Sequence, residues 1–142
     1  MTDAFHNLYN YKFTMDKVID GDTVKGYVHL GMGVTLDPQN FRLFGIDTPE
    51  KRGEQKPYGL LVKDKLIEKL EERKDLGESL YIRSIRDKKG KYGRYLIELL
   101  SGEGFSFNKW LVNSHYAVEY HGKSKDLIQK EHAKNRALVM GS

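Results

Sequence analysis

Residues 23–30 alternate clearly between two faces, and this alternation constrains the fold more than any other feature of the chain. Val24, Gly26, Val28 and Leu30 fall on one face, and Lys25, Tyr27 and His29 fall on the other. A period of two is typical of a β-strand with one buried face. Four further segments are rich in aromatic, β-branched or other apolar residues, and we expect strands there too. These segments are residues 11–20, 41–46, 80–86 and 92–100.

Three segments show helical patterns. In the first, Val62, Leu66 and Leu70 recur every four residues, while charged side chains occupy many of the positions between them. This is the pattern of an amphipathic helix. In the last, Ser124 is a helix cap and Asp126 lies in the first turn, where the helix dipole favours an acid. The predicted helices cover residues 60–73, 106–114 and 124–139.

The order of these elements predicts the fold class. Five short strands, with one helix after the third and two at the end, indicate an α+β fold that is mainly a β-barrel. We expect a five-stranded barrel of the OB type with three helices around it, an architecture that commonly binds nucleic acid. A chain of 142 residues is long enough for one domain with a real core. We therefore expect a single domain over residues 1–142.

The positive charge of the chain is concentrated in one stretch. The net charge is +4, whereas residues 83–94 contain six basic residues and one acid and therefore carry +5. A local basic loop is the footprint of contact with a phosphate backbone. The alternative is a solvated, lysine-rich hairpin tip. The basic residues are Arg83, Arg86, Lys88, Lys89, Lys91 and Arg94.

Composition excludes several kinds of site. The chain has no cysteine, so disulfides and thiolate metal sites are excluded. No apolar run approaches the roughly 20 residues of a membrane span. The N-terminus lacks the basic and apolar regions of a signal peptide, so we expect a cytoplasmic or phage-encoded protein unless a leader was removed. No apolar stripe demands a partner, and we expect a monomer.

Two short motifs place carboxylates at the ends of predicted strands. Asp22 follows the first strand in an Asp-Gly-Asp turn, and Asp47 follows the third in an Asp-Thr-Pro-Glu sequence. A hard divalent cation prefers oxygen ligands of this kind. Thr48 precedes a proline, which holds it extended and fixes the direction of its carbonyl, a further candidate ligand. Asp20 shares a side with Asp22 and is the candidate to support the site or to take a water.

Other residues match the remaining needs of phosphodiester hydrolysis. Arg42 and Arg94 are candidates for the phosphate oxygens, because a guanidinium binds two oxygens at once and stays charged. Glu50 is the candidate to orient or deprotonate the attacking water, and residues 51–56 after it read as a mobile loop. Lys91 could add a point charge, and Tyr92 a hydroxyl or a stacking face.

Each motif alone has an ordinary structural explanation. Asp-Gly-Asp is a common turn, and Asp-Thr-Pro-Glu is a common turn or helix start; their joint occurrence supports a site. Arg42 and Asp47 are five residues apart and would face opposite sides of a regular strand, so they converge only if the strand bends or ends near Gly45. The five histidines lack metal-ligand spacing, and we interpret them as surface or structural.

Together these motifs resemble the staphylococcal nuclease family. The resemblance spans residues 11–137 and is strongest at residues 18–24, 41–50 and 91–94, with the Tyr58-Gly59 pair also fitting. It implies an OB barrel with three helices that cleaves DNA and RNA in a Ca²⁺-dependent way, at the 5′-oxygen, to leave 3′-phosphates.

The resemblance also assigns roles residue by residue. It implies Ca²⁺ ligands at Asp22, Asp47 and Thr48, with Asp20 as a nearby acid. It implies phosphate-binding arginines at Arg42 and Arg94 and a catalytic glutamate at Glu50. It places Lys91 and Tyr92 near the substrate phosphates. Tyrosines that flank the nucleotide should lie in residues 116–123, where the register stays open between Tyr120 and Tyr116.

The chain departs from the family pattern in places. Residues 24–41 are several residues longer than in the best-known member, so we expect an extended hairpin around residues 31–33. His115 stands where a glycine ending the helix is expected. Two alternatives remain: a non-catalytic OB module that binds nucleic acid or a modified peptide, and a related nuclease that uses Mg²⁺ or Mn²⁺.

Overall fold

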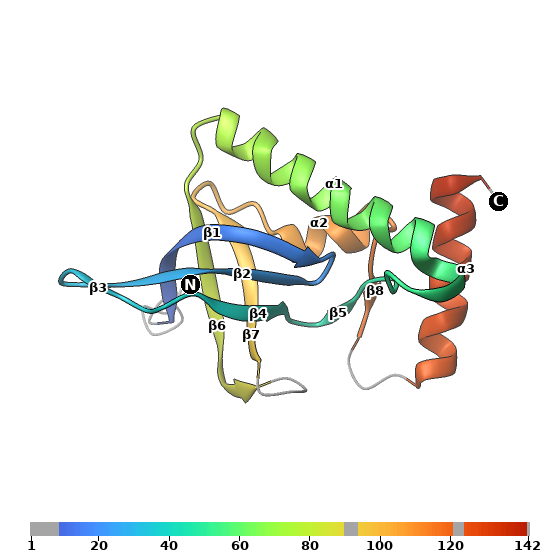
Figure 1. The fold of residues 1–142 in the computed structure, drawn as a ribbon, viewed down its shortest axis with the longest axis horizontal. Helices are drawn as coiled ribbons and strands as arrows, with labels where there is room; N and C mark the ends of the chain where they lie inside the picture. The colour runs from blue at the N-terminus through green and yellow to red at the C-terminus, as the bar shows by residue number, and fades with distance from the viewer. Residues whose placement is uncertain (1–8, 90–93, 121–123, 142) are drawn as a thin grey trace, which may run out of the picture.

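The structure is a computed structural model that describes residues 9–89, 94–120 and 124–141, with only the backbone described for residues 86–89. Five strands pair in a closed ring, in the order β1, β6, β7, β4, β2 and back to β1 (Figure 1). All of these pairings are antiparallel except that of β4 with β7. The strands are β1 (Asn10–Asp20), β2 (Thr23–Gly31), β4 (Gln39–Leu43), β6 (Leu80–Lys89) and β7 (Tyr95–Ser101).

Three helices pack around this ring. They are α1 (Lys56–Asp75), α2 (Phe107–Asn113) and α3 (Lys125–Met140). In Figure 1, α1 runs along one side of the barrel, and α3 stands at the end where β1 meets β2. The prediction of a five-stranded OB-type barrel with three helices is confirmed.

The core fills the barrel and the space beneath the helices. Val24, Leu43 and Ile97 of the barrel strands are fully buried, and so are Val62 of α1 and Leu111 of α2. The alternation predicted for residues 23–30 holds as far as Val28, because Val24, Gly26 and Val28 are buried whereas Tyr27 is exposed. It is wrong for Leu30, which is exposed near the end of the strand. Burial of these apolar side chains is the main force that closes the ring.

The prediction of one continuous strand over residues 41–46 is wrong, because the strand is broken in the middle. β4 ends at Leu43, a turn follows at Phe44 and Gly45, and β5 (Ile46–Asp47) pairs with β8 (Val118–Glu119) in a separate two-stranded sheet. Gly45 has a φ of 80°, a conformation that glycine adopts without steric cost. An apolar run does not reveal such a break, because the pattern stays apolar through the turn.

The helix predictions hold, with changed boundaries. α1 begins four residues earlier than expected, and Pro57 lies within its first turn, where a missing N–H costs nothing. Part of the expected loop at residues 51–56 is the short 3₁₀ helix η2 (Gly53–Gln55). The hydroxyls of Ser106 and Ser124 accept hydrogen bonds from Lys109 N (3.3 Å) and Leu127 N (3.2 Å) and cap α2 and α3.

The extended hairpin is also present. β3 (Val34–Thr35) pairs with β2 outside the ring, and the hairpin projects from the barrel in Figure 1. His115 follows α2 with a φ of 66°, the left-handed conformation expected of the glycine that it replaces. Within the described part of the chain, no helix is long and apolar enough to span a membrane.

Candidate active site

A pocket of about 220 Å³ opens where the ends of β1, β4 and β5 meet the loop before α1. Every described residue for which a catalytic or metal-binding role was predicted lines this pocket. Lys91 and Tyr92 lie outside the described residues. The lining residues are Asp20, Asp22, Arg42, Asp47, Thr48, Pro49, Glu50, Lys51 and Arg94.

Arg42 lies between the two carboxylates that were predicted to hold a cation. Its Nη2 donates to Asp22 Oδ2 at 3.3 Å, to Asp47 Oδ1 at 3.2 Å and to the carbonyl of Ile46 at 3.2 Å. The turn at Phe44 and Gly45 interrupts the regular alternation of side chains along the strand. Arg42 and Asp47, which are five residues apart, therefore both reach the pocket. The condition set for Arg42 and Asp47 to converge, a bend or end of the strand near Gly45, is met.

Asp22 is held by groups from two directions. Its Oδ2 accepts the backbone N–H of Thr48 at 3.3 Å, and its Oδ1 accepts the hydroxyl of Thr23 at 3.1 Å. Gly21 before it packs closely, since an added Cβ would lie 2.7 Å from a methyl group of Val62. These contacts fix the carboxylate at the pocket wall. The Thr48 atom seen to contact Asp22 is the amide N–H, and the predicted role of its carbonyl stays a prediction.

The remaining pocket residues differ in how firmly they are held. Lys51 Nζ contacts Asp20 Oδ1 at 3.0 Å and the carbonyl of Ile19 at 2.7 Å. Arg94 Nη1 donates to the hydroxyl of Thr23 at 3.3 Å. Glu50 is exposed, and its side chain makes no hydrogen bond or ion pair with any described residue. Its carboxylate is therefore the most available to an incoming molecule.

Sequence reasoning missed the contact of His132 with Asp47. His132 on α3 is 1% exposed, and its Nε2 lies 2.8 Å from Asp47 Oδ2. The interpretation of all histidines as surface or structural therefore overlooked a residue that touches the site. The two residues are 85 positions apart. The available signal was that His132 follows the apolar Ile128 by one helical turn on the inward face of α3.

Tyr120 comes close to the pocket without lining it. Its ring centre lies 6.0 Å from the guanidinium carbon of Arg42, and its backbone N–H donates to the carbonyl of Gly45 at 2.7 Å. Tyr116, the other candidate, packs against Trp110 with ring centres 5.5 Å apart. Of the two tyrosines, Tyr120 is the one that lies beside Arg42 of the pocket.

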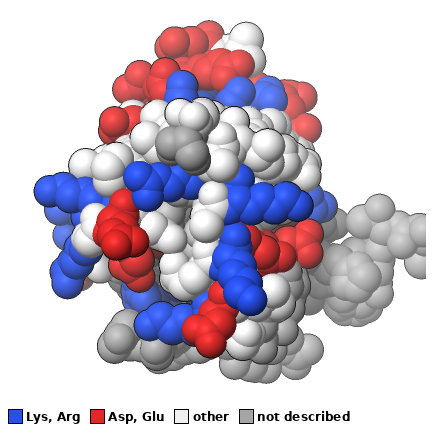
Figure 2. Space-filling view, turned by 90° about the vertical axis from the view of Figure 1, so that its right-hand side faces the viewer, with Lys and Arg blue, Asp and Glu red and all other residues white. Residues whose placement is uncertain are grey.

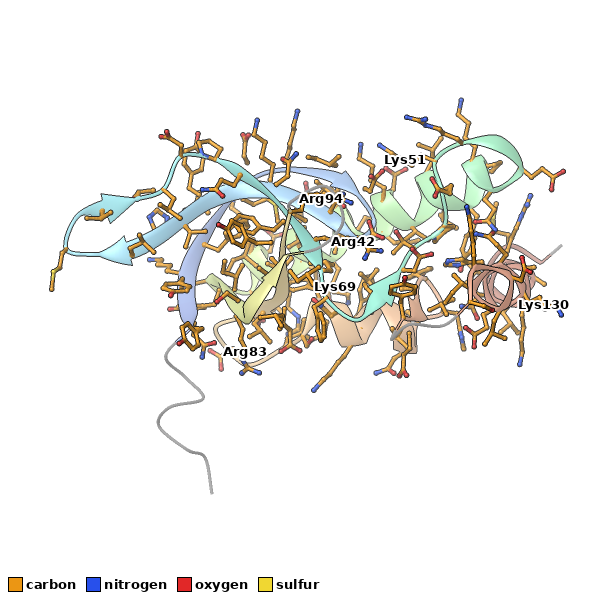
Figure 3. The ribbon with its side chains drawn as sticks, turned by 90° about the horizontal axis from the view of Figure 1, so that it is seen from below. Arg42, Lys51, Lys69, Arg83, Arg94 and Lys130 are labelled. Carbon is orange, nitrogen blue, oxygen red and sulfur yellow. The ribbon has the colours of Figure 1, made fainter. Side chains whose placement is uncertain are left out.

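The basic residues separate into those at the pocket and those elsewhere. Figure 3 shows Arg42, Arg94 and Lys51 toward the pocket end of the barrel, whereas Arg83 lies apart from them and Lys130 lies on α3. Arg83 pairs with Glu98 at 3.2 Å. On the α3 side of the molecule, Lys and Arg side chains are mixed with Asp and Glu (Figure 2). The face shown in Figure 2 is therefore not uniformly basic.

The donor set suits a hard cation only in part. Among the described residues, no three His, Cys, Asp or Glu side chains lie together as a ready-made metal cluster. Asp22 and Asp47 both contact one nitrogen of Arg42, so two carboxylates do converge. Ca²⁺ takes about six to eight oxygen ligands and accepts waters and carbonyls among them. Two carboxylates in an open polar pocket fit such an ion and not a soft metal.

The comparisons with known proteins identify the family. A family model described as staphylococcal nuclease homologue matches residues 40–138, a shorter span than the motifs indicated. It includes Arg42, Asp47, Glu50 and Arg94 but not Asp22. The comparison with curated proteins found no match. A match of this kind indicates a nuclease-type or nucleic-acid-binding OB fold. Because it covers well over half of the chain, this protein belongs to the staphylococcal nuclease homologue family.

Proposed function

We propose that this protein is a Ca²⁺-dependent nuclease that hydrolyses phosphodiester bonds of DNA and RNA. The observation that carries the proposal is the convergence of four carboxylates and three cationic side chains on one pocket of about 220 Å³. These groups come from segments far apart in the sequence. A network of ion pairs that only stabilises the fold would explain the contacts of Arg42 and Lys51 with the aspartates. It would not explain why the exposed carboxylate of Glu50 lies at the same pocket.

The charge of the pocket supports a bound cation. Among the described lining residues, Asp20, Asp22, Asp47 and Glu50 outnumber the three cationic side chains, which leaves these residues with a formal charge of −1. A pocket of that charge repels a phosphodiester, which is itself an anion. A divalent ion on Asp22 and Asp47, with the Thr48 carbonyl as a further ligand, would reverse the sign. When bound, such an ion neutralises charge on the phosphate as the transition state forms.

The two arginines are suited to hold the phosphate. All the hydrogen bonds of Arg42 use Nη2, so its Nε and Nη1 make none with the described residues. Both nitrogens can donate to phosphate oxygens, and donors of this charged kind bind phosphate strongly. Arg94 lines the same pocket from the strand β7 side. We assign both arginines to the phosphate, where their charge stabilises the developing negative charge.

Glu50 is the group we assign to the attacking water. Its carboxylate takes a proton from the water, whose oxygen bonds to phosphorus while the bond to the 5′-oxygen breaks. The leaving 5′-oxygen takes up a proton from solvent, so the products are a 3′-phosphate and a 5′-hydroxyl. We assign Asp20 to a supporting role beside the cation, and Lys91, Tyr92 and Tyr120 to substrate contacts.

The test is cleavage of labelled single-stranded DNA, duplex DNA and RNA in Ca²⁺, Mg²⁺, Mn²⁺ or chelator. Phosphatase treatment of the products then shows whether they carry a 3′-phosphate. The proposal predicts cleavage in Ca²⁺, none in chelator, and phosphatase-sensitive 3′ ends. Cleavage in Mg²⁺ or Mn²⁺ alone would keep the nuclease and reject Ca²⁺. Salt-sensitive binding without cleavage in any ion would reject the enzyme in favour of a binding module.

A further inference from the structure

The carboxylate of Asp47 is shared between two partners on opposite sides. Its Oδ1 contacts Arg42 at 3.2 Å, and its Oδ2 contacts His132 Nε2 at 2.8 Å. An ionised carboxylate only accepts hydrogen bonds, so the Nε2 of His132 carries the hydrogen. The imidazole is therefore a fixed donor behind Asp47, on the side away from Arg42.

His132 is poorly explained as a residue for stability alone. It is 1% exposed, one helical turn after Ile128, at a position on α3 where an apolar side chain would fill the same space. Its Nδ1 is buried and has no hydrogen-bond partner among the described residues. A buried polar atom without a partner costs free energy. The contact with Asp47 is the feature that offsets this cost.

Other contacts already dock α3 onto the rest of the protein. Gln55 Nε2 donates to Gln129 Oε1 at 2.8 Å, and Arg136 Nη1 donates to the carbonyl of Glu54 at 2.9 Å. Neither contact involves a residue that lines the pocket. His132, by contrast, makes a hydrogen bond from α3 to Asp47, which lines the pocket.

We propose that His132 is a positioning residue that holds Asp47 in the orientation needed to bind the cation. This inference rests on the proposed function, since it takes Asp47 to be a cation ligand. The donor keeps Oδ2 engaged on one side, so Asp47 does not turn to face Arg42 with both oxygens. Without it, a two-point ion pair with Arg42 competes for the oxygens that the cation needs. Loss of such a supporting hydrogen bond typically weakens metal binding about 10- to 100-fold.

The test measures cation affinity without nucleic acid. Tb³⁺ luminescence reports occupancy, and Ca²⁺ displaces the Tb³⁺ to give the Ca²⁺ affinity. His132→Leu removes the donor and keeps an apolar filling. His132→Gln places an amide N–H near the former Nε2, whereas the shorter His132→Asn does not reach Asp47. Gln129→Ala is the matched control, because it weakens helix docking on the same element. Thermal unfolding in chelator reports the folding of each variant.

We expect His132→Leu and His132→Asn to bind Ca²⁺ about 10- to 100-fold more weakly than the wild type. We expect His132→Gln and Gln129→Ala to bind within about threefold of it. If His132→Leu does not fold, the Ca²⁺ affinities of His132→Asn and His132→Gln are compared instead, and a weaker affinity in His132→Asn supports the inference.

Three results overturn the inference while leaving the proposed function intact. The first is a Ca²⁺ affinity equal to that of the wild type in His132→Asn and in any folded His132→Leu. The second is that His132→Gln and His132→Asn weaken Ca²⁺ binding equally. The third is that Gln129→Ala weakens Ca²⁺ binding as much as the His132 variants do. Absence of saturable Tb³⁺ and Ca²⁺ binding to the wild type would instead reject the proposed function itself, and this inference with it.

Discussion

Arg42 and Asp47 form an ion pair at 3.2 Å across the turn that separates β4 from β5. The turn is held from outside the motif. Asn108 Nδ2 donates to the carbonyl of Phe44 at 3.0 Å, and Tyr120 N donates to that of Gly45 at 2.7 Å. The geometry of the pocket therefore depends on α2 and on the segment that follows β8.

Asn108→Ala should destabilise the protein by about 2–4 kcal/mol. Asn108 is buried, accepts from Leu99 N and donates to the carbonyls of Phe44 and Ile97, and the substitution removes all three hydrogen bonds. Urea unfolding measures the change. Asn113→Ala at the exposed end of the same helix is the control and should change stability by less than about 0.5 kcal/mol. Equal effects of the two substitutions would refute the role given to Asn108.

Gly59→Ala should displace the loop that carries Glu50. A Cβ at this position would lie 2.1 Å from the carbonyl oxygen of Glu50 and 2.9 Å from that of Pro49. These are backbone atoms, so the loop must move, at a cost of about 1–3 kcal/mol. Calorimetry should show a lower Tm, and the cleavage rate should fall as well. A variant with unchanged Tm and rate would mean that the close packing of this loop is unimportant.

Arg42→Lys should lower kcat/KM for DNA cleavage by about 10²–10³. Lysine keeps the charge but loses the paired donors of the guanidinium. Steady-state rates on a labelled oligonucleotide give the value. Arg83→Lys, which alters an ion pair with Glu98 away from the pocket, should leave the rate unchanged. Near-native turnover in Arg42→Lys would count against the assignment of Arg42 to the phosphate.

Glu50→Gln should lower kcat by about 10²–10⁴, with a smaller change in KM. The side chain is exposed and has no partner among the described residues, so stability should not change. Pre-steady-state cleavage separates the chemical step from binding. The neighbouring exposed Glu54→Gln serves as the control. An unchanged rate constant for Glu50→Gln would remove this residue from the mechanism.

Tyr58→Phe should flatten the dependence of stability on alkaline pH. The buried Tyr58 hydroxyl donates to the carbonyl of His115, and burial together with the nearby Tyr116 raises the pKa of Tyr58 from 10.0 to about 12. The folded pKa lies above the unfolded one, so this group stabilises the fold fully below pH 10 and loses that contribution as the pH rises toward 12.

Urea unfolding of both proteins at pH 9 and at pH 11.5 tests this sign. The free energy of unfolding of the wild type should exceed that of Tyr58→Phe by about 1 kcal/mol at pH 9. This difference should be smaller at pH 11.5. A difference that stays constant or grows would contradict the account of Tyr58.

The sequence predicted the barrel and helices because their signals are local. The alternation over residues 24–28 and the serine cap of α3 depend on near neighbours, and both are present. A bend near Gly45 was considered only as a condition for Arg42 and Asp47 to converge. The end of β4 at Leu43 was not predicted, because Phe44 and Ile46 continue the apolar pattern through it. The contact of His132 with Asp47 joins residues 85 positions apart, and only the docking of α3 determines it.

The most direct test of the central claim is the Ca²⁺-dependent cleavage rate of the wild type beside Asp22→Ala, purified in parallel. Circular dichroism of both proteins confirms that the variant is folded. If the pocket is the active site, the wild type should cleave DNA in Ca²⁺ and stop in chelator, and Asp22→Ala should lose at least about 10² in rate. Equal Ca²⁺-dependent cleavage by the two proteins would show that the activity does not come from this pocket.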